Sequence, residues 1–167
     1  EFPVNDIIVR TPFRLSFLGG GTDIEAWYKD QGGAVLGMAM DKYCYLMGRY
    51  TPKEYDHKSK LVYSRLETVF DNKDLSHPVV REWLKCMDFG EGLEVHYWAD
   101  LPARKGLGAS SAFAVGFVCL LEELWGKPSS QEHYAFSANY LERYILKEAG
   151  GWQDPILCAL GGVNYIK

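Results

Sequence analysis

The sequence predicts mixed α and β structure, of either the α/β or the α+β class. Stretches rich in β-branched and aromatic residues, as strands are, alternate with stretches whose apolar residues recur at helical spacing. The 167 residues are 47% hydrophobic and 24% charged, which suits one globular domain or part of a larger protein.

The composition also limits which partners and which cell compartment are expected for the protein. With a net charge of −4, the chain gives no support for a nucleic-acid surface, which needs clustered basic charge. The longest apolar stretch, residues 112–121, is too short to span a membrane, and no signal peptide is evident. Cysteines are widely spaced in apolar contexts, so we expect buried free thiols in a reducing cytoplasm rather than disulfides or a metal site. They are Cys44, Cys86, Cys119 and Cys158.

The chain is expected to open with a strand and a short helix. Residues 7–18 have strand composition, and Pro12, which lacks an N–H, indicates an edge strand or a bulge. Three glycines then precede Thr22 and Asp23, either of which can cap a short helix over residues 24–29.

Further strands are expected before the middle of the chain. Residues 34–40 and 43–50 read as two paired strands around Asp41 and Lys42, apolar on both faces as in a covered sheet. A loop over 55–60, short strands over 61–63 and 68–70, a helix over 78–87 and a strand over 93–98 follow.

A glycine-rich loop lies at the centre of this organisation: Pro102-Ala-Arg-Lys-Gly-Leu-Gly-Ala-Ser-Ser-Ala112. A strand enters it, and a long apolar helix over 113–125 leaves it. Gly106 and Gly108 let backbone N–H groups approach an anion, and the helix N-terminus adds partial positive charge. The loop is neither a P-loop nor a dinucleotide fingerprint. It indicates a nucleotide-phosphate site or, alternatively, a plain turn in which serine caps a helix.

The remainder of the chain is expected to form two helices and a strand. The first helix starts at Ser129 or Ser130 and runs to about Lys147, with Glu142 off its apolar stripe. A short helix over 152–160 follows a glycine pair, and a strand begins at 163.

Taken together, these segments resemble the GHMP kinase superfamily. The central loop is similar to its phosphate motif, and Arg10-Thr-Pro-Phe-Arg-Leu-Ser-Phe-Leu-Gly-Gly-Gly-Thr-Asp23 resembles the branch of heptose 7-phosphate kinases and fucokinase-like sugar kinases. Gly151-Trp-Gln-Asp154 and Gly161-Gly-Val-Asn164 match the same branch. The resemblance implies an α+β N-terminal kinase domain over residues 1–167, with helices packed on one face of a mixed sheet. It also implies a second, C-terminal kinase domain, which this chain does not supply.

The resemblance further implies a transferase that moves the γ-phosphoryl group of ATP to a sugar hydroxyl, with Mg²⁺ as cofactor. Asp154 would act at the acceptor hydroxyl as base or stabiliser, with Arg14 beside it. Ser110 and Glu142 would be the Mg²⁺ ligands; Ala109, in place of the usual first serine, favours Ser110 over its neighbour. The expected phosphate-binding residues are Lys105, Gly106, Leu107, Gly108, Ala109, Ser110 and Ser111. The expected substrate-binding residues are Gly20, Gly21, Thr22 and Asp23.

Each role has an alternative. Asp154 can simply cap the helix that follows Gly151, Glu142 can be a solvated helix residue, and Arg14 can form a structural ion pair. For the whole chain, the expected acceptor is the anomeric hydroxyl of D-glycero-D-manno-heptose 7-phosphate or a related sugar. The alternatives are another small-molecule kinase of the superfamily, for fucose or a similar sugar, and a nucleotide-binding fragment that does not transfer phosphate.

Overall fold

The computed structural model describes residues 6–102 and 106–167. Lys105, expected to contact phosphate, and Arg104 lie outside the described residues. Among the described residues, no helix is both long and apolar enough to cross a membrane.

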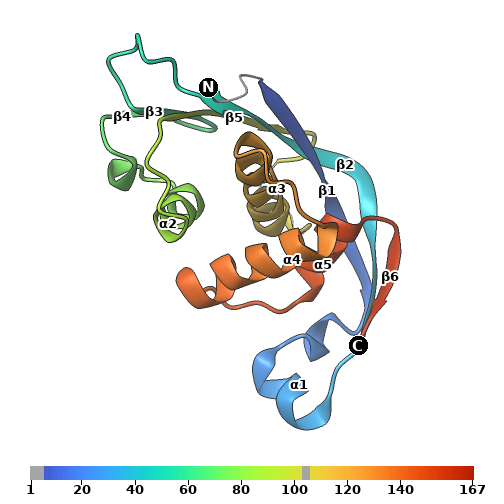
Figure 1. Ribbon diagram of the computed structural model, residues 1–167. Coiled ribbons are helices and arrows are strands. Elements are labelled where there is room, and N and C mark those ends of the chain that lie inside the picture. Colours follow the sequence, from blue (N-terminus) through green and yellow to red (C-terminus); the bar gives the residue numbers. More distant parts are fainter. Residues whose placement is uncertain (1–5, 103–105) are drawn as a thin grey trace.

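A single mixed sheet forms one layer of the fold (Figure 1). Its strands are β1 (Ile7–Leu18), β2 (Val35–Tyr50), β3 (Ser59–Val62), β4 (Leu66–Val69), β5 (Leu93–Ala99) and β6 (Val163–Ile166). The order is β1-β2-β5-β3-β4, with β6 also paired to β2. All pairs are antiparallel except β3 with β5, which are parallel. The expected α+β class with a mixed sheet is therefore confirmed.

The expectation of two paired strands over 34–40 and 43–50 is wrong. Residues Val35–Tyr50 form one strand of 16 residues, and both of its halves pair with β1. Asp41 and Lys42 do not form the tight turn, which favours glycine or asparagine at left-handed positions. A register shift between Pro12 and Arg14 instead lets the two strands follow one another around a bend. Pro12 thus lies on an edge strand next to an irregularity, as its missing N–H predicts.

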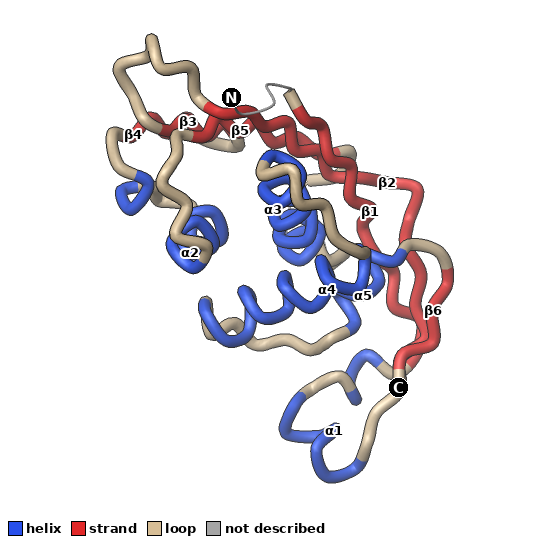
Figure 2. Tube along the Cα trace, in the orientation of Figure 1, coloured by secondary structure: helices blue, strands red, loops and turns tan. Residues whose placement is uncertain are grey.

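Helices cover one face of this sheet (Figures 1 and 2). They are α2 (Pro78–Cys86), α3 (Ala109–Leu124), α4 (Gln131–Tyr140) and α5 (Gln153–Leu160). Among residues 6–102 and 106–167, no helix packs on the other face. The expectation that β2 is covered on both sides is therefore wrong: its buried residues alternate with partly exposed ones. The arrangement of helices on one face is confirmed.

Helix α3 lies against β1 and β2 with almost no space between them. A Cβ added at Gly116 would come within 2.7 Å of Thr11 Oγ1, and one added at Gly48 would come within 2.7 Å of Leu120 Cδ2. Phe117, Leu120 and neighbouring side chains of α3 are fully buried. This packing fixes the N-terminal end of α3, where the glycine-rich loop ends.

Helix α4 continues into a π-helical turn, Leu141–Ile145. Ser130 accepts a hydrogen bond from the His133 N–H at 3.2 Å, which confirms a serine cap at the start of the helix. The π turn is closed by the bond from Leu146 N–H to the Leu141 carbonyl, and it carries Glu142 and Arg143. Such turns often occur at functional sites.

The short helix α1 (Glu25–Gln31) is capped differently from the prediction. Its N-cap is Ile24, without a side-chain cap, so neither Thr22 nor Asp23 serves as one. Thr22 Oγ1 instead accepts from the Ala34 N–H at 3.0 Å, which closes the loop around α1. The Asp23 side chain instead accepts hydrogen bonds from backbone N–H groups at the start of α5.

The cysteines are free thiols, and two of them depart from the expected burial. Cys44 and Cys158 are buried, Cys119 is partly exposed and Cys86 is exposed. Helix α2 buries Val79, Val80, Trp83 and Leu84, and Cys86 falls on its other face. The expectation of burial is therefore wrong for Cys86 and holds only in part for Cys119.

Candidate active site

An arginine of β1 and an aspartate of α5 form the central pair of the site. Arg14 Nε donates to Asp154 Oδ1 at 2.6 Å, and a terminal guanidinium nitrogen donates to Oδ2 at 2.7 Å. This two-point pairing fixes the carboxylate in plane and angle as well as in distance. The other terminal nitrogen of Arg14 donates to the Gly106 carbonyl at 2.7 Å. Arg14 thus joins the acid to the glycine-rich loop, and the predicted neighbours are brought together.

Asp154 is not the cap of α5. The N-cap position is Trp152, and Asp154 lies in the first turn with its side chain paired to Arg14. The alternative reading of Asp154 as a helix cap is therefore wrong. Its side chain is 27% exposed, so the carboxylate remains open to a ligand.

The glycine-rich loop has the conformation that its glycines predict. Gly106 and Gly108 have φ angles of 68° and 73°, which side chains other than glycine rarely adopt. A Cβ on Gly108 would also lie 2.9 Å from Arg14 Cγ. Gly108 itself is the N-cap of α3, and it provides no side-chain cap. The alternative reading of a serine-capped turn is therefore wrong, because Ser110 and Ser111 lie inside the first turn.

Glu142 of the π turn lies beside these two serines. Ser111 Oγ is 3.0 and 2.8 Å from the two carboxylate oxygens, and Ser110 Oγ is 3.3 Å from one of them. Glu142 is only 8% exposed, so the alternative of a solvated helix residue is wrong. Burial raises the pKa of Glu142 to about 7, although hydrogen bonds from the serines act in the opposite direction.

This environment fits a magnesium ion only together with a phosphate. Mg²⁺ is typically held by one or two carboxylates plus phosphate oxygens and water. Within residues 6–102 and 106–167, no group of three or more His, Cys, Asp or Glu side chains is placed to hold a metal. One buried carboxylate with adjacent hydroxyls is therefore suited to a metal that arrives with a phosphorylated ligand. Ser110 is exposed and Ser111 is buried, so Ser110 is the more accessible hydroxyl.

An aromatic cleft opens from the loop, and it was not predicted. A cavity of ≈ 540 Å³ is lined by Arg14, Asp154 and residues 106–110. Aromatic rings form much of the rest. The His77 ring stacks on Phe113 with centroids 4.6 Å apart and meets Tyr63 edge-on at 5.1 Å. Burial lowers the pKa of His77, which favours the neutral form of the ring.

A smaller, polar cavity of ≈ 260 Å³ also borders the Arg14–Asp154 pair. Its lining includes Arg14, Asp23, Ser110, Glu142, Arg143 and Asp154. Because Arg14, Ser110 and Asp154 line both cavities, the pair stands where an aromatic compartment meets a polar one.

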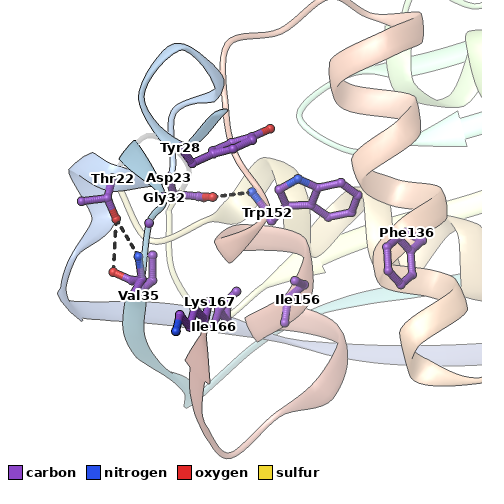
Figure 3. A pocket seen from close by; sticks show the side chains of 12 residues that line it. Thr22, Asp23, Tyr28, Gly32, Val35, Phe136, Trp152, Ile156, Ile166 and Lys167 are labelled. Carbon is purple, nitrogen blue, oxygen red and sulfur yellow. Dashed lines mark hydrogen bonds between the residues drawn. The ribbon is translucent and has the colours of Figure 1, made fainter. Parts of the chain in front are cut away.

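The expected substrate-binding residues do not all meet this polar cavity. Gly20 and Asp23 line it, whereas Thr22 faces a third cavity of ≈ 450 Å³ with Tyr28, Phe136 and Trp152 (Figure 3). Gly21 is exposed.

Asp23 has strong partners of its own. Its carboxylate accepts the Trp152 N–H at 2.9 Å and the Gln153 N–H at 2.8 Å (Figure 3 shows the first bond). Burial raises the pKa of Asp23, while these two N–H groups act to lower it. Asp23 therefore caps α5, a helix far away in the sequence.

Comparison with known proteins assigns the family. The family description "GHMP kinases N terminal domain" matches residues 76–162, more than half of the chain. The chain belongs to the GHMP kinase family. The matched residues include the glycine-rich loop, Glu142 and Asp154, so these features of the site belong to the GHMP kinase domain.

Curated relatives in the GHMP kinase family include sugar kinases. D-glycero-alpha-D-manno-heptose 7-phosphate kinase of Campylobacter jejuni is 30% identical over 176 residues, a match that covers 96% of this chain and 50% of the relative. The bifunctional fucokinase/GDP-fucose pyrophosphorylase of Arabidopsis thaliana is 27% identical over 186 residues, covering 94% of this chain and 16% of the relative. The chain thus spans half the length of the first relative and a smaller share of the second.

Solved structures support the same GHMP kinase fold. A D-glycero-D-manno-heptose 1-phosphate kinase from Bacteroides thetaiotaomicron superposes with a TM-score of 0.83 at 23% identity, covering 95% of this chain and 55% of that one. The mevalonate kinase of Methanococcus jannaschii gives a TM-score of 0.76 at 15% identity, covering 98% and 54%. At these identities the likeness concerns the fold alone.

Proposed function

We propose that this domain belongs to an ATP-dependent sugar kinase that transfers the γ-phosphoryl group to a sugar hydroxyl. The observation that carries the proposal is the two-point Arg14–Asp154 pair, held against the glycine-rich loop and between two cavities. A positioned carboxylate beside a phosphate-binding loop is what phosphoryl transfer to a hydroxyl requires, because that reaction depends mainly on positioning and charge neutralisation.

ATP would occupy the loop and the aromatic cleft. The backbone N–H groups of residues 106–111, at the N-terminus of α3, would bind the phosphates. The adenine base of ATP would lie among Tyr63, His77 and Phe113, whose flat faces suit an aromatic ring. The lowered pKa of His77 agrees with this assignment, because a neutral ring adds no charge to the cleft.

Glu142 and Ser110 would hold Mg²⁺, with Ser111 fixing the Glu142 carboxylate. When bound, the ion supplies positive charge that offsets the triphosphate. Binding would favour the ionised form of Glu142, whose pKa of about 7 leaves it partly protonated in neutral solution.

Asp154 would accept the proton of the acceptor hydroxyl. As that oxygen bonds to the γ-phosphorus, the bond between this phosphorus and the β–γ bridging oxygen breaks, and ADP leaves. Arg14 would keep the Asp154 carboxylate oriented through its two hydrogen bonds. The third hydrogen bond of Arg14, to the Gly106 carbonyl, would hold the Asp154 carboxylate at a fixed position relative to the glycine-rich loop.

The polar cavity beside Asp154 would receive the sugar, with Gly20 and Asp23 at its edge. The similarity to a heptose 7-phosphate kinase supports the anomeric hydroxyl of D-glycero-D-manno-heptose 7-phosphate as acceptor. The similarity to a fucokinase supports fucose as the alternative. A second domain in the parent protein would close the site.

The free cysteines favour a reducing cytoplasm as the compartment of the protein.

The test is an ADP-release assay of the full-length protein with Mg-ATP and a panel of sugars and sugar phosphates. The panel contains D-glycero-D-manno-heptose 7-phosphate, fucose and galactose. We expect release with at least one of them and formation of the corresponding sugar phosphate. A folded protein that binds Mg-ATP but phosphorylates none of the panel would contradict the proposal and favour a nucleotide-binding role.

A further inference from the structure

The turn that leads into α5 is held from two sides. On one side, both carboxylate oxygens of Asp23 accept backbone N–H groups, those of Trp152 and Gln153. On the other side, Asn139 of α4 donates from its side-chain amide to the Gly151 carbonyl at 2.8 Å. Asp154 is the next residue after this three-residue turn. The place of its carboxylate therefore depends on contacts that Asp154 does not itself make.

Gly151 shows how closely the turn is enclosed. A Cβ built there would lie 2.0 Å from both the carbonyl oxygen and Oδ2 of Asp23. Such a distance is far inside van der Waals contact, so the turn has no room for a side chain. Next to it, a Cβ on Gly150 would meet nothing within 4 Å. The close approach is thus specific to the residue that lies between Asp23 and Asn139.

We propose that Asp23 and Asn139 are positioning residues that set Asp154 for catalysis by clamping the 151–153 turn. The proposal rests on the proposed kinase function. Asp23 is 8% exposed and Asn139 is fully buried, so their burial suits a supporting role. Loss of either clamp would let α5 move relative to β1, which carries Arg14. Misplacement by about 1 Å can reduce a rate by about 10²-fold.

A sugar contact by Asp23 predicts a different result from a clamp. A residue that binds the sugar equally in the ground state and transition state changes KM, whereas one that orients a catalytic group changes kcat. Asn139 sharpens this distinction, because a fully buried side chain cannot contact the sugar. A shared effect of the two residues on kcat would therefore arise through the turn.

The experiment compares Asp23→Asn and Asn139→Ala in the full-length protein, with Asp71→Asn as matched control. Asp71 also accepts a backbone N–H, that of Lys73, but caps the short 3₁₀ helix Asn72–Asp74, which is not part of the site. We expect both test variants to lower kcat by about tenfold or more, with KM for the sugar and affinity for Mg-ATP within about twofold of wild type. The control should retain wild-type kcat.

Amide hydrogen exchange in this protein provides a readout independent of catalysis. In Asp23→Asn, the Trp152 and Gln153 amides should exchange at least about tenfold faster, while the α3 amides keep their protection.

Unchanged exchange at residues 151–154 in both variants would overturn the clamp. A higher sugar KM with unchanged kcat in Asp23→Asn would also overturn it, in favour of a sugar contact. If Asp23→Asn does not fold, Asn139→Ala decides by the same criteria. A wild-type protein that phosphorylates no sugar would contradict the proposed function, while exchange would still decide whether the turn is clamped.

Discussion

The two carboxylates of the site, Asp154 and Glu142, have opposite surroundings. Asp154 is partly exposed and meets the permanent positive charge of Arg14 at two points. Glu142 is buried against the hydroxyls of Ser110 and Ser111, and burial raises its pKa to about 7. One carboxylate thus has a cation built into the fold, whereas the partners of the other are neutral.

This difference separates two tasks that a kinase site must perform. A carboxylate oriented by arginine can act on a hydroxyl in every catalytic cycle without rearranging. A buried carboxylate among hydroxyls gains most from a cation that arrives with the substrate, because the cation offsets the cost of burying charge. We therefore propose that Asp154 acts on the acceptor hydroxyl and that Glu142 binds the metal.

The largest effect is expected for Asp154→Asn. The variant keeps the shape of the side chain but removes the proton-accepting carboxylate and weakens the pair with Arg14. We expect kcat to fall by about 10²-fold or more, measured by ADP release with the preferred sugar. Near-normal turnover would show that Asp154 does not take part in the chemistry, and it would contradict the catalytic role proposed for this carboxylate.

Next in size is the contrast between two adjacent glycines. Gly151→Ala would place a methyl group 2.0 Å from Asp23, whereas Gly150→Ala has free space. We expect Gly151→Ala to lower the free energy of unfolding by about 2 kcal/mol or more, in chemical denaturation, and to reduce turnover. Gly150→Ala is the control and should stay within about 0.5 kcal/mol of wild type. Equal losses would show that Asp23 does not confine this turn.

Glu142 should make stability depend on pH. Its folded pKa of about 7 lies above the ordinary value of 4.5, so the folded state binds the proton more tightly than the unfolded state does. The resulting stabilisation is complete below about pH 4.5 and is lost as the pH rises through 7. From pH 5 to 8, without metal, wild type should lose on the order of 2–3 kcal/mol relative to Glu142→Gln. Parallel melting profiles of the two proteins across this range would contradict a buried, metal-free carboxylate.

The smallest effect distinguishes the two serines. Ser111 is buried and lies within 3.0 Å of both Glu142 oxygens, while Ser110 is exposed and 3.3 Å from one. We expect Ser111→Ala to lower the free energy of unfolding by about 1 kcal/mol and Ser110→Ala to lower it by less than about 0.5 kcal/mol. Urea titrations of both variants measure this difference. The reverse order would assign the structural hydroxyl to Ser110.

Local signals in the sequence identified most of the elements. The missing N–H of Pro12 placed it on an edge strand, and Ser130 starts α4 as a serine cap should. Such features act within a few residues, so they can be recognised without a partner. The continuous strand β2 escaped recognition because its course depends on the register with β1.

Long-range contacts limited the prediction of the site. The resemblance to the GHMP kinases identified Arg14, Asp154 and Glu142, which the fold brings to one place from β1, α5 and the π turn. The clamp by Asp23 joins residues about 130 positions apart and leaves no pattern at either end. The aromatic cleft also leaves no pattern in the sequence, because Tyr63, His77 and Phe113 lie in separate segments with no shared spacing.

The division of tasks between the two carboxylates is tested most directly by calorimetric titration of Mg-ATP into this protein. Three proteins are compared: wild type, Glu142→Gln and Asp154→Asn. We predict that Glu142→Gln binds Mg-ATP at least about tenfold more weakly than wild type, while Asp154→Asn binds within about twofold of it. Weaker binding in Asp154→Asn with wild-type affinity in Glu142→Gln, or equal losses in both, would contradict the assignment.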